Sequence, residues 1–95
     1  MYCEVIVTPA GKRSLAFLTS HCPSVQETIE LTKCAGILSG VLQYDPAQQG
    51  SNYTLKPNRR ILHRGPLSVH YDLLFKNAKW IVEIVGYGRN PRWVW

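Results

Sequence analysis

The spacing of apolar residues changes once along the chain and divides it into a helical part and a strand-like part. Between residues 9 and 44, apolar positions recur every three or four residues, which is typical of amphipathic helices. After residue 58 they alternate with polar positions or form short β-branched and aromatic runs, as strands do. A Val- and Ile-rich run at residues 2–8 precedes the helices. The pattern therefore predicts the element order β-α-α-β-β-β.

Capping residues indicate where the two helices begin. Thr8, followed by a proline, is a suitable cap for a first helix that ends near residue 20. Ser24, with a glutamate three residues later, caps a second helix that we expect to continue to about Tyr44. Gly36 and Gly40 lie inside this second helix, and we predict that they allow another backbone to approach closely. The polar residues that follow, up to residue 58, predict a surface loop.

The last third of the chain contains three strand-type runs, at residues 61–62, 67–73 and 80–85. The links between them are short, and short links favour antiparallel hairpins. Strands that follow helices indicate an α+β domain, with two N-terminal helices packed on one face of a mostly antiparallel four-stranded sheet. In the middle run, alternation predicts that three polar side chains point to the face left open by the helices: Ser68, His70 and Asp72.

Length and composition narrow the class of protein. Ninety-five residues predict a single domain over residues 1–95. No apolar run approaches the roughly 18 residues that a membrane-spanning helix needs, so we expect no membrane partner. The three cysteines are too few for a secreted disulfide framework, and the first residues do not have the pattern of a signal peptide. These features predict a reduced, cytoplasmic protein.

The net charge of +5 is concentrated in the second half of the chain. Residues 1–50 contain three Lys or Arg against four Asp or Glu, whereas residues 51–95 contain eight against two. A basic region of this kind favours a polyanionic partner, or an acidic protein segment that masks it. A basic surface that only faces solvent is the alternative explanation.

The basic residues of the strand region are candidates for contacts with nucleic acid. Neighbouring strands lie about 4.8 Å apart, so side chains from several strands can form a patch roughly 10–15 Å across. Such a patch can bind a phosphate backbone and stabilise the charge that develops when an RNA 2′-hydroxyl attacks its own phosphodiester. Histidine can transfer a proton near neutral pH, and aromatic side chains can stack on unpaired bases. The catalytic candidates are Arg60, His63, Arg64, His70, Tyr87 and Arg89, and the candidates for nucleic-acid binding are Lys56, Arg59, Lys79, Arg92 and Trp93.

Other chemistries find little support in the sequence. No close pair of cysteines or histidines has the spacing of a structural zinc site, and no glycine-rich nucleotide loop is present. Three histidines alone define no Ser-His-Asp arrangement. We therefore expect neither a metal ion nor another cofactor.

Four segments, spread over nearly the whole chain, carry a family resemblance: VIVTPAGKRSLAFL, YDP, RRILHRGPLSVHYDL and WIVEIVGYGRN. Together with the predicted element order, they resemble the RelE/ParE toxin superfamily of bacterial type II toxin–antitoxin systems. The resemblance implies a small basic toxin that is neutralised by a cognate antitoxin from the same operon. RelE-like members cleave mRNA on the ribosome without a metal ion, whereas ParE-like members inhibit DNA gyrase.

The match to the RelE-like nuclease motifs is partial. These nucleases have basic residues on the second strand, a role open to Arg59, Arg60 and Arg64. They also have an arginine on the third strand, three residues before a tyrosine; here Tyr71 fits, but Ser68 stands at the arginine position. Arg89 comes one residue later than the arginine of the family's turn after the last strand, and the C-terminal tail has no counterpart of the catalytic tyrosine.

Three functions follow from the resemblance. The first is a ribosome-dependent mRNA endonuclease that inhibits translation, in which the arginines bind phosphate and His63, His70 or Tyr87 transfers protons. The second is a ParE-like protein that binds gyrase without RNA chemistry, which the absent arginine and tyrosine favour. The third is a catalytically decayed family member retained for antitoxin binding. The nuclease is our working hypothesis.

Overall fold

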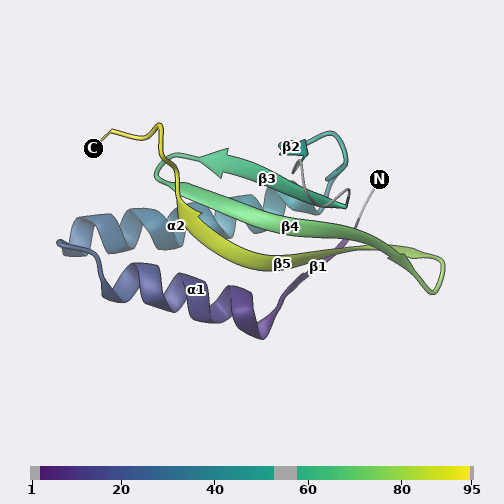
Figure 1. Ribbon diagram of the computed structural model, residues 1–95, viewed down its shortest axis with the longest axis horizontal. Helices are drawn as coiled ribbons and strands as arrows, with labels where there is room; N and C mark the ends of the chain where they lie inside the picture. Colours follow the sequence, from purple (N-terminus) through teal and green to yellow (C-terminus); the bar gives the residue numbers. More distant parts are fainter. Residues whose placement is uncertain (1–2, 53–57, 95) are drawn as a thin grey trace.

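The computed structural model describes residues 3–52 and 58–94, which form two helices and five strands (Figure 1). In chain order these elements are β1 (Glu4–Val7), α1 (Pro9–Ser20), α2 (Val25–Leu42), β2 (Ser51–Asn52), β3 (Arg59–Arg64), β4 (Leu67–Lys76) and β5 (Lys79–Arg89). Both helices lie on the same side of the sheet (Figure 1). The predicted α+β class is therefore confirmed.

The first helix begins where its cap predicts and lies very close to β5. The Thr8 side chain accepts a hydrogen bond from the Gly11 amide at 3.1 Å and donates one to the Ile84 carbonyl at 2.9 Å. A Cβ at Gly11 would lie only 2.6 Å from that carbonyl oxygen, so glycine is needed for this close approach. We predicted such a role for Gly36 and Gly40, but a Cβ at either position would meet no atom within 4 Å. That prediction is wrong.

The second helix also has the predicted start. The Ser24 side chain accepts a hydrogen bond from the Glu27 amide at 3.2 Å. The helix ends at Leu42, two residues before the expected Tyr44. Its apolar face packs mainly on β4 and β3, while α1 packs on β5. The two helices together therefore cover the central strands of the sheet.

The sheet has the strand order β1-β5-β4-β3-β2, with β1 parallel to β5 and every other pair antiparallel. The strand count differs from the predicted four because β2 lies inside the segment that we expected to be only a loop. This two-residue strand pairs Ser51 with Ile61 and Asn52 with Arg60. Residues 53–57 of the same segment lie outside the described residues.

The core lies between α2 and the middle of the sheet. Tyr71 is fully buried there, and the single proton of its hydroxyl is shared between two acceptors, the carbonyl oxygens of Pro46 at 2.8 Å and Gln49 at 2.9 Å. The polar end of this side chain is thus satisfied by the segment after α2, which it holds against the sheet. The other residues with 0–1% exposure in this core are Cys3, Leu31, Leu38, Leu42, Leu67, Val69, Val82 and Ile84.

Candidate nucleic-acid interface

Two exposed arginines from different strands lie at the end of the sheet where β3 turns into β4. Arg64 pairs with Leu67, and Leu67 pairs with Arg89. Directly opposed residues share a face of the sheet, and Leu67 is fully buried, so both arginines flank it on the helix side. Arg89 Nη2 also lies 3.9 Å from Cys22 Sγ, just before α2. Two strand spacings, about 10 Å, separate the backbones of the two arginines.

A third arginine is brought to the same end by the C-terminal tail. The Asn90 amide donates to the Pro66 carbonyl at 2.8 Å, and the Asn90 side chain donates to the Gly65 carbonyl at 2.9 Å. The Arg92 amide in turn donates to Asn90 Oδ1 at 3.1 Å. Arg92 and the neighbouring Trp93 are exposed, Trp93 to 42%. We call Arg64, Arg89 and Arg92 the basic end of the molecule.

His63 lies beside the basic end but belongs to the other face of β3. It pairs with Ser68 across the β3–β4 hairpin, and its Nδ1 atom is 2.5 Å from Ser68 Oγ. His63 is exposed, whereas Ser68 is only 3% exposed. Ser68 therefore points away from the core face, as predicted, but it is covered and not open to solvent.

His70 shares this face with His63 and is partly buried. Burial lowers the pKa of His70 below the usual 6.5, and the positive charges of Arg59 and His63 lower it further. The neutral imidazole is consequently the dominant form of His70 at neutral pH.

The first two arginines of β3 are engaged with other parts of the protein. Arg59 forms a bidentate ion pair with Asp72, with contacts of 2.7 and 2.9 Å. Arg60 donates twice to the Gln49 carbonyl, at 3.0 and 2.8 Å, and once to the Gly50 carbonyl at 3.1 Å. A further hydrogen bond joins Arg60 to the side chain of Asn52. Arg60 thus holds the segment that contains β2, a structural role that we did not predict.

Tyr87 is placed differently from our expectation. It is 8% exposed, and burial raises the pKa of its hydroxyl, with a hydrogen bond to Ser39 acting in the opposite direction. The reason is an irregularity in the pairing of β4 with β5: His70 pairs with Gly86, but Tyr71 pairs with Ile84. The extra residue of β5 inverts the alternation and turns Tyr87 toward the helices. Neither base stacking nor proton transfer at the surface is compatible with this burial.

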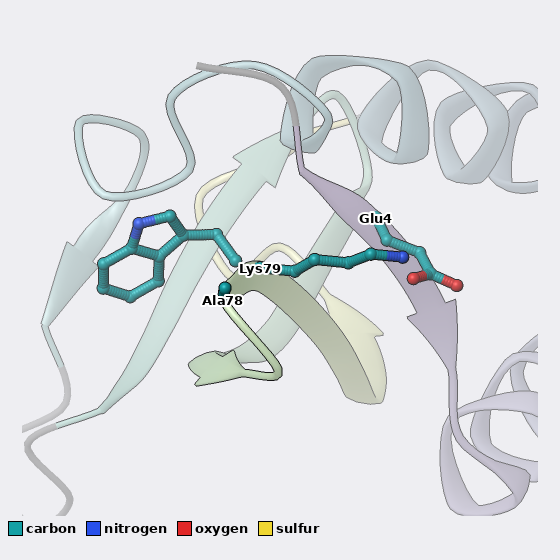
Figure 2. Close-up of a pocket in the computed structure, with 4 residues that line it drawn as sticks. Glu4, Ala78 and Lys79 are labelled. Carbon is teal, nitrogen blue, oxygen red and sulfur yellow. The ribbon is translucent and has the colours of Figure 1, made fainter.

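Lys79 lies at the opposite end of the sheet, where the β4–β5 hairpin turns (Figure 1). The ten residues of β4 span about 30 Å between the two ends. Figure 2 shows the Lys79 side chain extending toward Glu4 at the edge of an open hollow of about 370 Å³, also lined by Ala78 and Trp80. Lys79 therefore does not join Arg64 in one patch, contrary to our expectation. Lys56, the remaining nucleic-acid candidate, lies outside the described residues.

Within residues 3–52 and 58–94, no group of three or more His, Cys, Asp or Glu side chains is arranged to hold a metal ion. In the same residues, no helix has the length and apolar character needed to span a membrane. Cys3, Cys22 and Cys34 are free thiols, and Cys3 and Cys34 are buried.

The contact between His63 and Ser68 was not predicted, although the sequence contains a signal for it. A two-residue turn at Gly65-Pro66 pairs the residues on either side of it, and the next pair along the hairpin is His63 with Ser68. The attachment of Asn90 to this turn had no comparable signal, because it joins segments that are 25 residues apart.

Known structures of toxin–antitoxin proteins have the same fold. A chain of the crystal structure of the RelBE2 toxin–antitoxin complex from Mycobacterium tuberculosis aligns with a TM-score of 0.69 and 16% identity, covering 95% of this chain and 100% of that one. A chain of the chromosomal ParDE toxin–antitoxin system from P. aeruginosa aligns with a TM-score of 0.63 and 19% identity, covering 93% of this chain and 96% of that one. No family model and no curated protein matches the sequence. The protein therefore has the fold of the small α+β toxins, and within that class the RelE/ParE-like fold.

Proposed function

We propose that this protein is the toxin of a type II toxin–antitoxin pair, that a cognate antitoxin neutralises it, and that it cleaves mRNA on the ribosome in the cytoplasm. Its likeness to chains of two toxin–antitoxin systems supports the first part of this proposal. A fold alone does not define an activity, so the nuclease assignment depends on the site. The observation that carries it is the basic end, where three exposed arginines from two strands and the tail lie beside His63.

The basic end suits the chemistry of RNA cleavage. Arginine binds phosphate through a planar fork of N–H groups and keeps its charge at all physiological pH values. Arg64 and Arg89, about 10 Å apart, can contact neighbouring phosphates of one strand of RNA. The 2′-hydroxyl attacks phosphorus and loses its proton to solvent, while the bond to the 5′-oxygen breaks and that oxygen takes up a proton from solvent; the attack increases the negative charge at the phosphate that the arginines contact. Fixed positive charges stabilise that transition state more than they stabilise the bound substrate.

The test is induced expression in a bacterial host, followed by mapping of mRNA 5′ ends. We expect growth arrest and new cuts inside translated codons. In purified ribosome complexes, the double variant Arg64→Gln/Arg89→Gln should cleave at least about 10²-fold more slowly, as expected when preorganised charge is lost from a transition state. Lys76→Gln/Lys79→Gln is the matched control, because it removes two positive charges from the opposite end of the sheet. Equal cleavage by the double variant and the wild type would exclude the basic end as the nuclease site.

Inhibition of DNA gyrase is the second candidate function. Two observations favour it: Tyr87 is buried, and Ser68, where RelE-like nucleases have an arginine, is covered and bonded to His63. Both reduce the number of groups available for RNA chemistry. A supercoiling assay with purified gyrase separates the two functions. Growth arrest without mRNA cuts, together with inhibited supercoiling, would replace the nuclease assignment by a ParE-like one.

A further inference from the structure

The hydrogen bond between His63 and Ser68 determines which nitrogen of the imidazole carries the proton. Ser68 is 3% exposed, and its hydroxyl lies 2.5 Å from His63 Nδ1. Within the described part of the chain, this is the one hydrogen bond of the Ser68 side chain. A buried hydroxyl that donates to no acceptor is unfavourable. Ser68 therefore donates to Nδ1, and the proton of the neutral imidazole is on Nε2.

The position of His63 makes that Nε2–H group accessible to a ligand. The short strand β2 covers β3 only at Arg60 and Ile61, so it does not reach His63. His63 is exposed, and Nε2 is the ring nitrogen farther from the backbone. Arg64 is the next residue along the strand. The two side chains lie on opposite faces of β3, so an RNA strand that crosses the edge of β3 left uncovered by β2 can contact the Arg64 guanidinium on one side and the His63 Nε2–H group on the other.

We propose that Ser68 is a positioning residue that holds His63 as a hydrogen-bond donor, through Nε2, to a phosphate oxygen of RNA bound at the basic end. This inference deepens the proposed nuclease function and rests on it. It also changes the role of His63: a neutral imidazole with its proton on Nε2 cannot accept a proton there. His63 then stabilises negative charge on the phosphate, as a preorganised N–H donor does, instead of acting as the general base.

The first test examines the tautomer of His63 without any RNA. Long-range ¹H–¹⁵N spectra near pH 8, above the usual histidine pKa of about 6.5, should show Nε2 protonated and Nδ1 shifted by an accepted hydrogen bond. Ser68→Thr should keep this signature because it keeps the hydroxyl. Ser68→Ala should lose the Nδ1 shift. A proton on Nδ1 in the wild type, or identical spectra for wild type and Ser68→Ala, would overturn the inference.

The second test separates hydrogen-bond donation from proton transfer. The amide nitrogen of glutamine can replace the Nε2–H group as a donor, but an amide cannot act as a base near neutral pH. We expect His63→Ala to cleave mRNA on the order of 10²-fold more slowly, the loss typical of a missing donor, and His63→Gln to retain activity within about tenfold of the wild type. If His63→Gln were as inactive as His63→Ala, while both remained folded, His63 would be a proton-transfer residue.

A third measurement distinguishes failure of this inference from failure of the nuclease assignment. Inorganic phosphate and a short single-stranded RNA are titrated into the ¹⁵N-labelled protein, with Lys79→Gln as the control. A change at the His63 Nε2–H signal that disappears in Arg64→Gln supports the donor role, even if the protein cleaves no mRNA. Changes at the Arg64 side chain with none at His63 would refute the donor role, whatever the nuclease assay shows.

Discussion

Replacing Arg60 by methionine should destabilise the fold and leave the activity of the folded molecules intact. In the structure, Arg60 donates to the carbonyl oxygens of Gln49 and Gly50 and bonds to the side chain of Asn52. These contacts attach the segment after α2 to β3. Methionine retains the aliphatic part of the side chain and removes the guanidinium, so the variant isolates the hydrogen bonds.

The size of the effect follows from these contacts. Hydrogen bonds to a charged group contribute about 1.5–3 kcal/mol each when buried, but Arg60 is partly exposed and water replaces part of what is lost. The Gln49 carbonyl also keeps its hydrogen bond from Tyr71 at 2.9 Å, so it is not left without a donor. We therefore expect the free energy of unfolding to fall by about 1–2 kcal/mol. For a domain of this size, that corresponds to a decrease in Tm of roughly 4–16 °C.

Urea unfolding followed by circular dichroism measures this change, and Arg64→Met is the matched control. In the described residues, Arg64 makes no side-chain hydrogen bond, so its replacement should change stability by less than about 0.5 kcal/mol. The growth-arrest assay should show the reverse order, with Arg64→Met impaired and Arg60→Met active at a permissive temperature. Wild-type stability of Arg60→Met combined with loss of toxicity would refute this reasoning and return Arg60 to the functional site.

Two further predictions concern stability. Gly11→Ala should lower the free energy of unfolding by about 1–3 kcal/mol because its Cβ would collide with the Ile84 carbonyl. Gly36→Ala adds a Cβ in open space on a helix and should raise the free energy of unfolding by about 0.5–1 kcal/mol. Equal effects of the two variants in urea unfolding would contradict the contact between Gly11 and Ile84. The lowered pKa of His70 predicts that stability depends on pH. The contribution of His70 to stability is fully present above pH 6.5, the ordinary histidine pKa, and is lost as the pH falls through the pKa of His70 in the folded state. The reason is that the unfolded chain binds the proton more readily than the folded one. Unfolding measured from pH 8 to pH 5 should show this loss in the wild type and a smaller one in His70→Gln.

The elements of the fold were largely predictable because they depend on local rules. Thr8 and Ser24 each stand directly before a helical pattern and cap the helix that follows, and the change of apolar period separates helices from strands. The two-residue strand β2 was missed because it has no apolar pattern of its own. The side chain of Arg60 holds β2 in place, and no pattern in the sequence indicates that these two segments are in contact.

The arrangement of the site was predictable only in part. Arg-Ile-His and Arg-Leu-Arg are nearly equivalent patterns, so the sequence of β3 does not determine which set faces the helices. The pairing of Leu62 with the buried Val69 settles this and separates His63 from Arg64. Tyr87 was misplaced because simple alternation fails at the irregular pairing in β5. Such irregularities depend on the partner strand and cannot be recognised from the sequence of β5 alone.

The attachment of the tail to the β3–β4 turn has a consequence for the entropy of binding. Asn90 fixes the first residues after β5 through both its backbone and its side chain, and Arg92 is anchored to Asn90. A charged residue on an unattached terminus would lose backbone freedom when it met a ligand, at a cost of about 1–2 kcal/mol for each residue ordered. Here that freedom is already lost when the chain folds. An anion that binds Arg92 at the basic end therefore meets a backbone whose shape exists before it arrives.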